Sequence, residues 1–200
     1  MDVTNFENLS EGKKQVILSA GILCFGRSGY EKTAISEIAK EAGISKSAIF
    51  HYFGTKHDLF LYLCRYVRSE VDSIFAEGTE DYFDSVALFL QAQFQMVKKH
   101  PGMYEFMRLV SECIETEGLD SLVLIRKEYH EKNEHTVLAK VNWNKFNDNY
   151  DRATIANLTK WVGNGCLMDF DKTLSLDGIF AEVTRYFTII KIALYKQEFL

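Results

Sequence analysis

The chain has 200 residues, of which 47% are hydrophobic and 26% charged, and its net charge is −5. This composition excludes a disordered chain, and the length suffices to bury a sizeable core in one large domain or two small ones. One proline and 12 glycines leave few helix breakers, and apolar residues recur at every third or fourth position, so we expect an all-helical protein.

Membrane, secreted and metal-binding classes find little support in the sequence. No apolar run approaches the roughly 18–20 residues of a membrane span, and residues 1–14 are too polar for a secretory signal. Cys24, Cys64, Cys113 and Cys166 are far apart and have apolar neighbours, which indicates reduced core thiols. We therefore expect a cytoplasmic protein without a metal or other cofactor.

The charge is distributed unevenly along the chain. Residues 13–56 hold seven basic and three acidic residues, a net charge of +4, which leaves −9 for the remainder. A basic first quarter is compatible with a nucleic-acid partner, although the net charge alone argues against one.

The first predicted helix covers residues 10–27, and Gly26 and Gly29 are expected to end it. Thr33 is a predicted N-cap for a short second helix, because Glu37 then lies in the first turn, where a carboxylate favours the helix dipole.

A third helix follows closely after a glycine turn. Gly43 is predicted to stop the second helix, Ser45 to cap the third, and Gly54 to follow its end near Tyr52. A longer amphipathic helix begins near Lys56. Helix, glycine turn and short helix together outline a helix-turn-helix.

The helix after Ser45 has two distinct faces. Ile49 and Phe53 are four positions apart and share a face with Ile44, so we expect them in the core. The opposite face is formed by Lys46, Ser47, Phe50 and His51.

Five further helices are predicted, which makes about nine in all. They cover residues 80–99, 102–116, 119–143, 151–169 and 176–197. The breaker His100-Pro101-Gly102 separates the first two, and the stretch 142–151, rich in asparagine and aspartate, is a predicted turn.

Residues 25–60 resemble the DNA-binding region of the tetracycline-repressor-like (TetR) family of bacterial regulators. The resemblance is carried without a gap by Phe25, Gly29, Tyr30, Thr33, Ile38, Ala39, Ala42, Gly43, Ser45, Tyr52, Phe53, Lys56 and Leu59. It implies a helix-turn-helix domain at 1–55 and a helical effector-binding and dimerisation domain at 56–200. It also implies a regulator, most often a repressor, that binds an inverted-repeat operator of double-stranded DNA as a homodimer and is released by a small effector.

The predicted contacts with DNA divide into two kinds. Lysine and serine can bond base edges and phenylalanine can contact a thymine methyl, so the predicted base-reading residues are Lys46, Ser47 and Phe50. Donors around the same helix can bind phosphates, and these are Thr33, Ser45, His51, Tyr52 and Lys56.

The resemblance also implies an effector cavity between the central helices, for an apolar or aromatic compound. Large apolar residues there are candidates for its lining, although an ordinary core explains most of them equally well: Phe89, Phe94, Met103, Phe106, Met107, Trp143 and Trp161.

The last helix carries apolar residues on more than one side, which favours a partner beyond its own core. Family members typically pair through the last two helices. The predicted dimer interface contains Leu158, Val162, Val183, Phe187, Ile190 and Leu194.

Two other functions are weighed against this interpretation. Acidic clusters at 147–151 and 169–171 could serve a small magnesium-dependent enzyme of isoprenoid type, but a turn and a helix end explain them better. His130 and His135 are five positions apart and point away from each other on a helix, which disfavours a zinc site. An architectural nucleic-acid protein would lack an effector cavity.

Overall fold

The computed structural model describes residues 3–74, 78–112, 138, 140–168 and 175–200. Within these ranges the chain is all-helical, apart from one isolated antiparallel bridge between Phe146 and Tyr195. The chain forms two compact units. The first contains Met1–Ser73 and Gln95–Tyr129, and the second contains Ile74–Phe94 and His130–Leu200.

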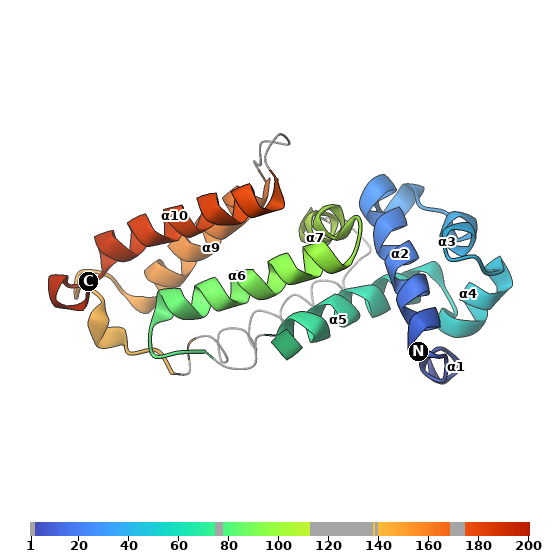
Figure 1. The fold of residues 1–200 in the computed structure, drawn as a ribbon, viewed down its shortest axis with the longest axis horizontal. Coiled ribbons are helices and arrows are strands. Elements are labelled where there is room, and N and C mark those ends of the chain that lie inside the picture. The colour runs from blue at the N-terminus through green and yellow to red at the C-terminus, as the bar shows by residue number, and fades with distance from the viewer. Residues whose placement is uncertain (1–2, 75–77, 113–137, 139, 169–174) are drawn as a thin grey trace. The chain divides into compact units, whose positions relative to one another are not determined.

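The helices of the first unit are α1 (Thr4–Glu7), α2 (Glu11–Lys32), α3 (Ile35–Glu41), α4 (Lys46–Phe53), α5 (Lys56–Ile74), the C-terminal end of α6 (Tyr82–Lys99) and α7 (Met103–Glu112). The predicted helix-turn-helix, α3 and α4, lies beside α2 at the edge of the unit (Figure 1). The sequence did not predict α1. The division at residue 55 was implied by the family resemblance, and it remains a prediction.

α2 and α7 meet at two glycines. A Cβ atom at Gly26 would lie 2.6 Å from the carbonyl oxygen of Gly102, and one at Gly102 would lie 2.9 Å from Cα of Leu23. The expectation that Gly26 ends the helix is therefore wrong. Gly26 instead allows the backbones of the two segments to come into contact. The break lies at Gly29, which takes a φ of 77°.

A buried histidine joins three helices of the first unit. His100 accepts or donates a 2.8 Å hydrogen bond with Ser19 of α2 and a 3.1 Å bond with Tyr66 of α5. Burial, followed by the nearby charge of Lys99, lowers the pKa of His100. The imidazole is therefore neutral at physiological pH and serves as a polar link inside the core.

The second unit is built on the last two long helices. It contains the start of α6, a 3-10 turn at Trp143–Lys145, α9 (Arg152–Met168), α10 (Leu176–Leu194) and a final 3-10 turn at Gln197–Phe199. α9 and α10 pack side by side (Figure 1). Their core includes aromatic and aliphatic side chains of all these segments, among them Tyr82, Phe83, Phe146, Ile155 and Phe187.

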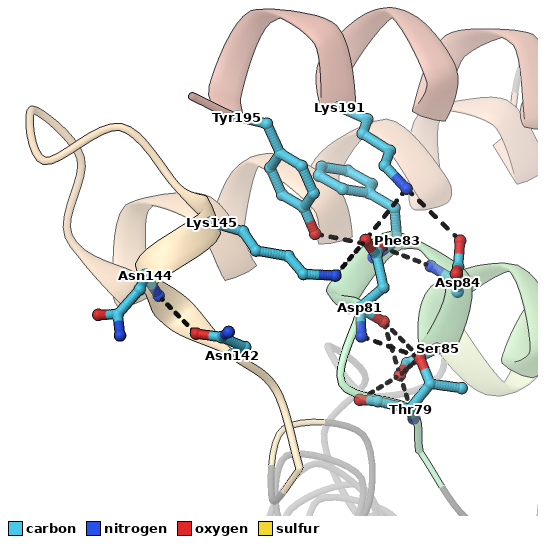
Figure 2. A network of polar contacts seen from close by, with 10 residues as sticks. All are labelled: Thr79, Asp81, Phe83, Asp84, Ser85, Asn142, Asn144, Lys145, Lys191 and Tyr195. Carbon is cyan, nitrogen blue, oxygen red and sulfur yellow. Dashed lines mark hydrogen bonds and ion pairs between the residues drawn. The ribbon is translucent and has the colours of Figure 1, made fainter. Parts of the chain in front are cut away.

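Asp81 ties the start of α6 to the C-terminal end of α10 (Figure 2). Its carboxylate accepts hydrogen bonds from Lys145 and Lys191, each at 3.1 Å, and from the Tyr195 hydroxyl at 3.1 Å. It also accepts from the backbone N–H of Phe83 at 3.0 Å and so caps α6. Burial alone would raise the pKa of Asp81, but the bonds from the two lysines outweigh it and hold the pKa below its ordinary value.

Most predicted helix boundaries agree with the described elements. The predicted helix at 119–143 lies largely outside the described residues, and its predicted end is wrong, because Trp143 opens a 3-10 turn. Cys24 and Cys64 are buried, reduced thiols, as predicted, whereas Cys113 and the side chain of Cys166 lie outside the described residues. No helix in the described ranges is long and apolar enough to cross a membrane.

Candidate nucleic-acid interface

α3 and α4 form the predicted helix-turn-helix. Gly43 takes a φ of 66° in the turn between them, a conformation that glycine adopts without steric cost. Ile38 of α3 and Ile49 and Phe53 of α4 are fully buried beneath the two helices. The inward face of α4 is therefore the one that the periodicity predicted.

The opposite face of α4 is exposed. It presents Lys46, Ser47, Phe50 and His51 to solvent. The ammonium group of Lys46 lies 5.7 Å from the centre of the Phe50 ring, close enough for a cation–π contact. A cation, a hydroxyl, an aromatic ring and an imidazole are thus displayed together on a helix narrow enough to enter a DNA major groove.

Ser45 is the N-cap of α4, as predicted. Its Oγ accepts a 3.1 Å hydrogen bond from the backbone N–H of Ala48. The hydroxyl proton of Ser45 is not used by this bond, so the exposed side chain can still donate to a phosphate oxygen.

Thr33 does not match its predicted roles. The N-cap of α3 is Ala34, and the cap is completed only from the other side, where Glu37 accepts from the Ala34 N–H at 3.1 Å. Thr33 is only 1% exposed, and its hydroxyl lies 2.6 Å from the Gly29 carbonyl and 3.1 Å from the Cys24 carbonyl. A buried hydroxyl that bonds backbone carbonyls of the preceding helix cannot reach a phosphate. We therefore no longer count Thr33 among the predicted phosphate contacts.

Tyr52 lies in the last turn of α4, and Lys56 is the first residue of α5. Lys56 donates to the Glu31 carbonyl at 3.0 Å, and its Nζ lies 4.7 Å from the centre of the Tyr30 ring. An ammonium group has three N–H donors, so this bond leaves donors for a phosphate. Tyr52 is half-buried, and its ring meets that of Phe6 edge-on at 6.1 Å.

The residues predicted to line an effector cavity do not come together in one unit. Met103 and Phe106 are fully buried in the first unit, where Phe106 packs on Phe60 at 5.5 Å. Met107 is half-buried in the same unit. These three residues of α7 therefore belong to the core around α2 and α5.

The remaining four candidates lie in the second unit. Phe94 of α6 meets Phe180 of α10 edge-on at 4.9 Å. Phe89, also on α6, is half-buried. Trp143 stacks on Phe146 at 5.4 Å. Trp161 is 67% exposed, which contradicts a place in the wall of an internal cavity of that unit.

A cleft of about 340 Å³ opens on the first unit instead. Its lining is Gln15, Val16, Ser19, Ala20, Leu23, Glu41 and Pro101. None of the predicted pocket residues lines this cleft, so the position of an effector site remains a prediction.

The two aspartates of the acidic stretch 147–151 form an ion pair and a helix cap. Asp148 pairs with Lys196 at 2.9 Å, and Asp151 caps α9 by accepting from the backbone and the hydroxyl of Thr154 at 2.8 and 2.9 Å. The second acidic stretch, 169–171, and the pair His130 and His135 lie outside the described residues. Among the described residues no cluster of three or more His, Cys, Asp or Glu side chains could hold a metal ion.

The predicted dimer residues pack inside the second unit. Val183, Phe187 and Leu194 are buried in its core, and Leu158, Val162 and Ile190 are partly buried against it. The free apolar surface is elsewhere on the same two helices, at Trp161, Tyr186, Ile189 and Ile192. The six residues predicted for the dimer interface thus pack in or against the core of the second unit, and the interface itself remains a prediction.

A family model described as bacterial regulatory proteins of the tetR family matches residues 17–63, which include the whole helix-turn-helix. The repressor AcnR of Corynebacterium glutamicum is 36% identical over 65 residues, which are 32% of this chain and 35% of AcnR. The regulator RutR of Escherichia coli is 36% identical over 55 residues, 28% of this chain and 26% of RutR. The chain thus matches about a third or less of the length of these curated relatives.

Solved structures extend the likeness in fold to nearly the whole chain. The ketosteroid transcriptional regulator KstR2 of Mycobacterium tuberculosis superposes with a TM-score of 0.69 over 95% of this chain and 98% of its own, at 13% identity. A TetR-family regulator from Agrobacterium tumefaciens gives 0.71 over 93% and 99%, at 16% identity. Residues 17–63 thus carry the sequence pattern of the tetR family, and the chain is similar in fold to solved TetR-family regulators along nearly its whole length.

Proposed function

We propose that this protein is a DNA-binding transcriptional regulator that uses the exposed face of α4 to read an operator. The observation that carries the proposal is the separation of the two faces of that helix. Ile49 and Phe53 anchor it in the core, while Lys46, Ser47 and Phe50 project outward at its start and middle. The residues on the outer face are exposed, and their chemistry suits base edges.

Affinity in this proposal comes mainly from groups around the helix. Ser45, His51, Tyr52 and Lys56 supply hydroxyl, imidazole and ammonium donors on both sides of α4. Such donors bind phosphates and fix the register of the protein without reading sequence. Binding to DNA should therefore weaken steeply with salt, because each phosphate contact releases counterions.

We propose a homodimer that pairs through the outer faces of α9 and α10. Trp161 on α9 is 67% exposed, and on α10 Tyr186, Ile189 and Ile192 are 36%, 56% and 58% exposed. Large apolar side chains exposed on two neighbouring helices favour a partner, and a second copy of the chain gives a closed twofold assembly. Two copies of α4 would then read an operator whose halves are inverted repeats.

Repression with release by a small apolar or aromatic effector is the regulatory mode that we propose. The relatives AcnR and RutR are described as a transcriptional repressor and a transcriptional regulator. An effector would release DNA only to the extent that it binds better to a conformation in which the two α4 helices no longer match the operator. Its cavity would lie in the helical part of the chain that follows the helix-turn-helix.

The proposal is tested by selecting duplexes from a random DNA library with the full-length protein. We expect an enriched inverted repeat, bound by two copies of the chain. The log of its affinity should fall linearly with log salt, with a slope of about −0.9 for each phosphate contact. Failure to enrich any sequence above a scrambled control would contradict the proposal.

A further inference from the structure

The short helix α1 precedes the segment that matches the family model, and it packs against the C-terminal end of α4. α1 has only four residues, Thr4–Glu7, and it lies before residue 17, where the family match begins. A helix of this length has no stability of its own in water. Its place must therefore be held by contacts with the rest of the first unit.

Phe6 supplies the main contact. Its side chain is fully buried at 0% exposure. The ring centre lies 4.7 Å from that of Phe53, 5.3 Å from that of Tyr62 and 6.1 Å from that of Tyr52. Phe6 thus fills the space between the last turn of α4 and the first half of α5, and such ring pairs add to the apolar burial itself.

Glu7 supplies a second contact beside it. Its carboxylate accepts a hydrogen bond from the Tyr62 hydroxyl and lies 3.4 Å from the ammonium group of Lys14. Burial, together with the bond to Glu7, raises the pKa of Tyr62, so its hydroxyl remains a donor throughout the physiological range. The two residues therefore attach α1 to α2 and α5 as well as to α4.

The last turn of α4 depends on this support. α4 has eight residues and ends at Gly54, which takes a φ of 79°. Ile49 anchors the middle of the helix, whereas Tyr52 and Phe53 at its end rest against Phe6. A small tilt of so short a helix would move the outward side chains by more than the tolerance of about 0.5 Å that a binding constellation allows.

We propose that α1 is a positioning element for DNA recognition, in which Phe6 and Glu7 fix the C-terminal turn of α4 and the ring of Tyr52. The affinity for the operator then depends on two residues that do not touch the DNA. This inference rests on the proposed function of α4 and adds the N-terminal segment to its determinants.

The test compares full-length variants on the duplex selected by the wild-type protein. Phe6→Ala removes the ring, and Tyr62→Phe removes only the hydrogen bond to Glu7. Phe146→Ala is the matched control, because it removes an equally buried ring from the second unit. Affinity is measured well below the melting transition of every variant, with the folded state checked by circular dichroism and the dimer by light scattering.

We expect Phe6→Ala to weaken operator binding by about tenfold and to lower the salt slope by about one for each subunit, because Tyr52 no longer holds its phosphate. Tyr62→Phe should weaken binding by about two- to fivefold. Phe146→Ala should lower the melting temperature while leaving both quantities unchanged. If Phe6→Ala does not fold, the operator affinity of Tyr62→Phe alone tests the role of α1.

Two results would overturn the inference. One is operator affinity and salt slope equal to those of the wild type in Tyr62→Phe and in a folded Phe6→Ala. The other is an equal loss in Phe146→Ala, which would assign the effect to general stability. A wild-type protein that enriches no duplex would instead contradict the proposed function itself, which separates the two failures.

Discussion

Lys46 and Lys56 show how two residues of one type differ in their surroundings. Lys46 stands on the exposed face of α4 with its ammonium group 5.7 Å from the Phe50 ring, whereas Lys56 donates to the carbonyl of Glu31. The periodicity of α4 was enough to predict the first placement. The second depends on the end of α2 coming close to the start of α5, which no local pattern contains.

Thr33 marks the limit of local inference at this scale. Its place after a glycine turn and before a short helix is typical of an N-cap, which would leave its hydroxyl exposed. The hydroxyl instead bonds the carbonyls of Cys24 and Gly29. Because Thr33 is buried, its hydroxyl needs a hydrogen-bond partner inside the protein, and these carbonyls provide it.

Replacing Lys56 by methionine should weaken binding to all DNA sequences alike. The variant keeps an apolar side chain beside Tyr30 but loses the ammonium group that we assign to a phosphate. We expect the salt slope to fall by about one for each subunit, while the ratio of affinities for operator and scrambled duplex stays the same. An altered ratio in fluorescence anisotropy titrations would mean that Lys56 takes part in reading sequence.

At the scale of helices, the contacts of α2 explain why the first unit holds together. α2 touches α7 at Gly26 and Gly102, and it bonds the end of α6 through Ser19 and His100. The sequence predicted most helix boundaries in the described ranges, since they are set by glycines and caps. It did not predict α1, because four residues carry no period, and a single buried phenylalanine in a polar segment was the only signal.

His100 gives the first unit a pH dependence whose sign follows from its surroundings. Burial lowers its pKa below the ordinary 6.5, with a further contribution from Lys99, whereas the charge of Glu70 opposes it. Ser19 and Tyr66 bond the ring, and Lys99 also pairs with Glu70. Between the ordinary and the lowered value the unfolded chain binds more protons, so stability falls as pH drops below 6.5.

We therefore expect the melting temperature to decrease between about pH 7.5 and about pH 5.5, and to decrease less in the variant His100→Gln. Glutamine can still bond Ser19 and Tyr66 but does not titrate. The other histidines remain in both proteins, so the difference between the two curves reports His100. Parallel curves in differential scanning calorimetry would show that His100 does not cause the loss.

At the scale of the whole molecule, the proposed dimer depends on the outer faces of α9 and α10. The sequence indicated that α10 has more apolar surface than one core requires. It could not show which side faces the core, because apolar residues occupy both. Packing against Tyr82, Phe83 and Phe146 assigns Val183, Phe187 and Leu194 inward and leaves Ile189 and Ile192 outside.

Ile189→Glu should convert the dimer into a monomer, since a carboxylate in an apolar interface is left unpaired. The control is Thr184→Glu, which adds the same charge at an exposed position on another side of α10. We expect light scattering to report a monomer for the first variant and a dimer for the control. Operator affinity should fall with the monomer, because only one half-site is then bound at a time. A dimeric Ile189→Glu would place the interface elsewhere.

The role of α4 is tested most directly by titrating the selected operator and a scrambled duplex with wild-type protein and with Lys46→Ala, at the same salt concentration. Lys46 is exposed and anchors no core, so the variant should fold and melt like the wild type. If Lys46 reads a base edge, its loss costs about 1–3 kcal/mol on the operator and much less on scrambled DNA, so the discrimination between the two duplexes shrinks. An unchanged ratio of the two affinities would contradict this reading of α4.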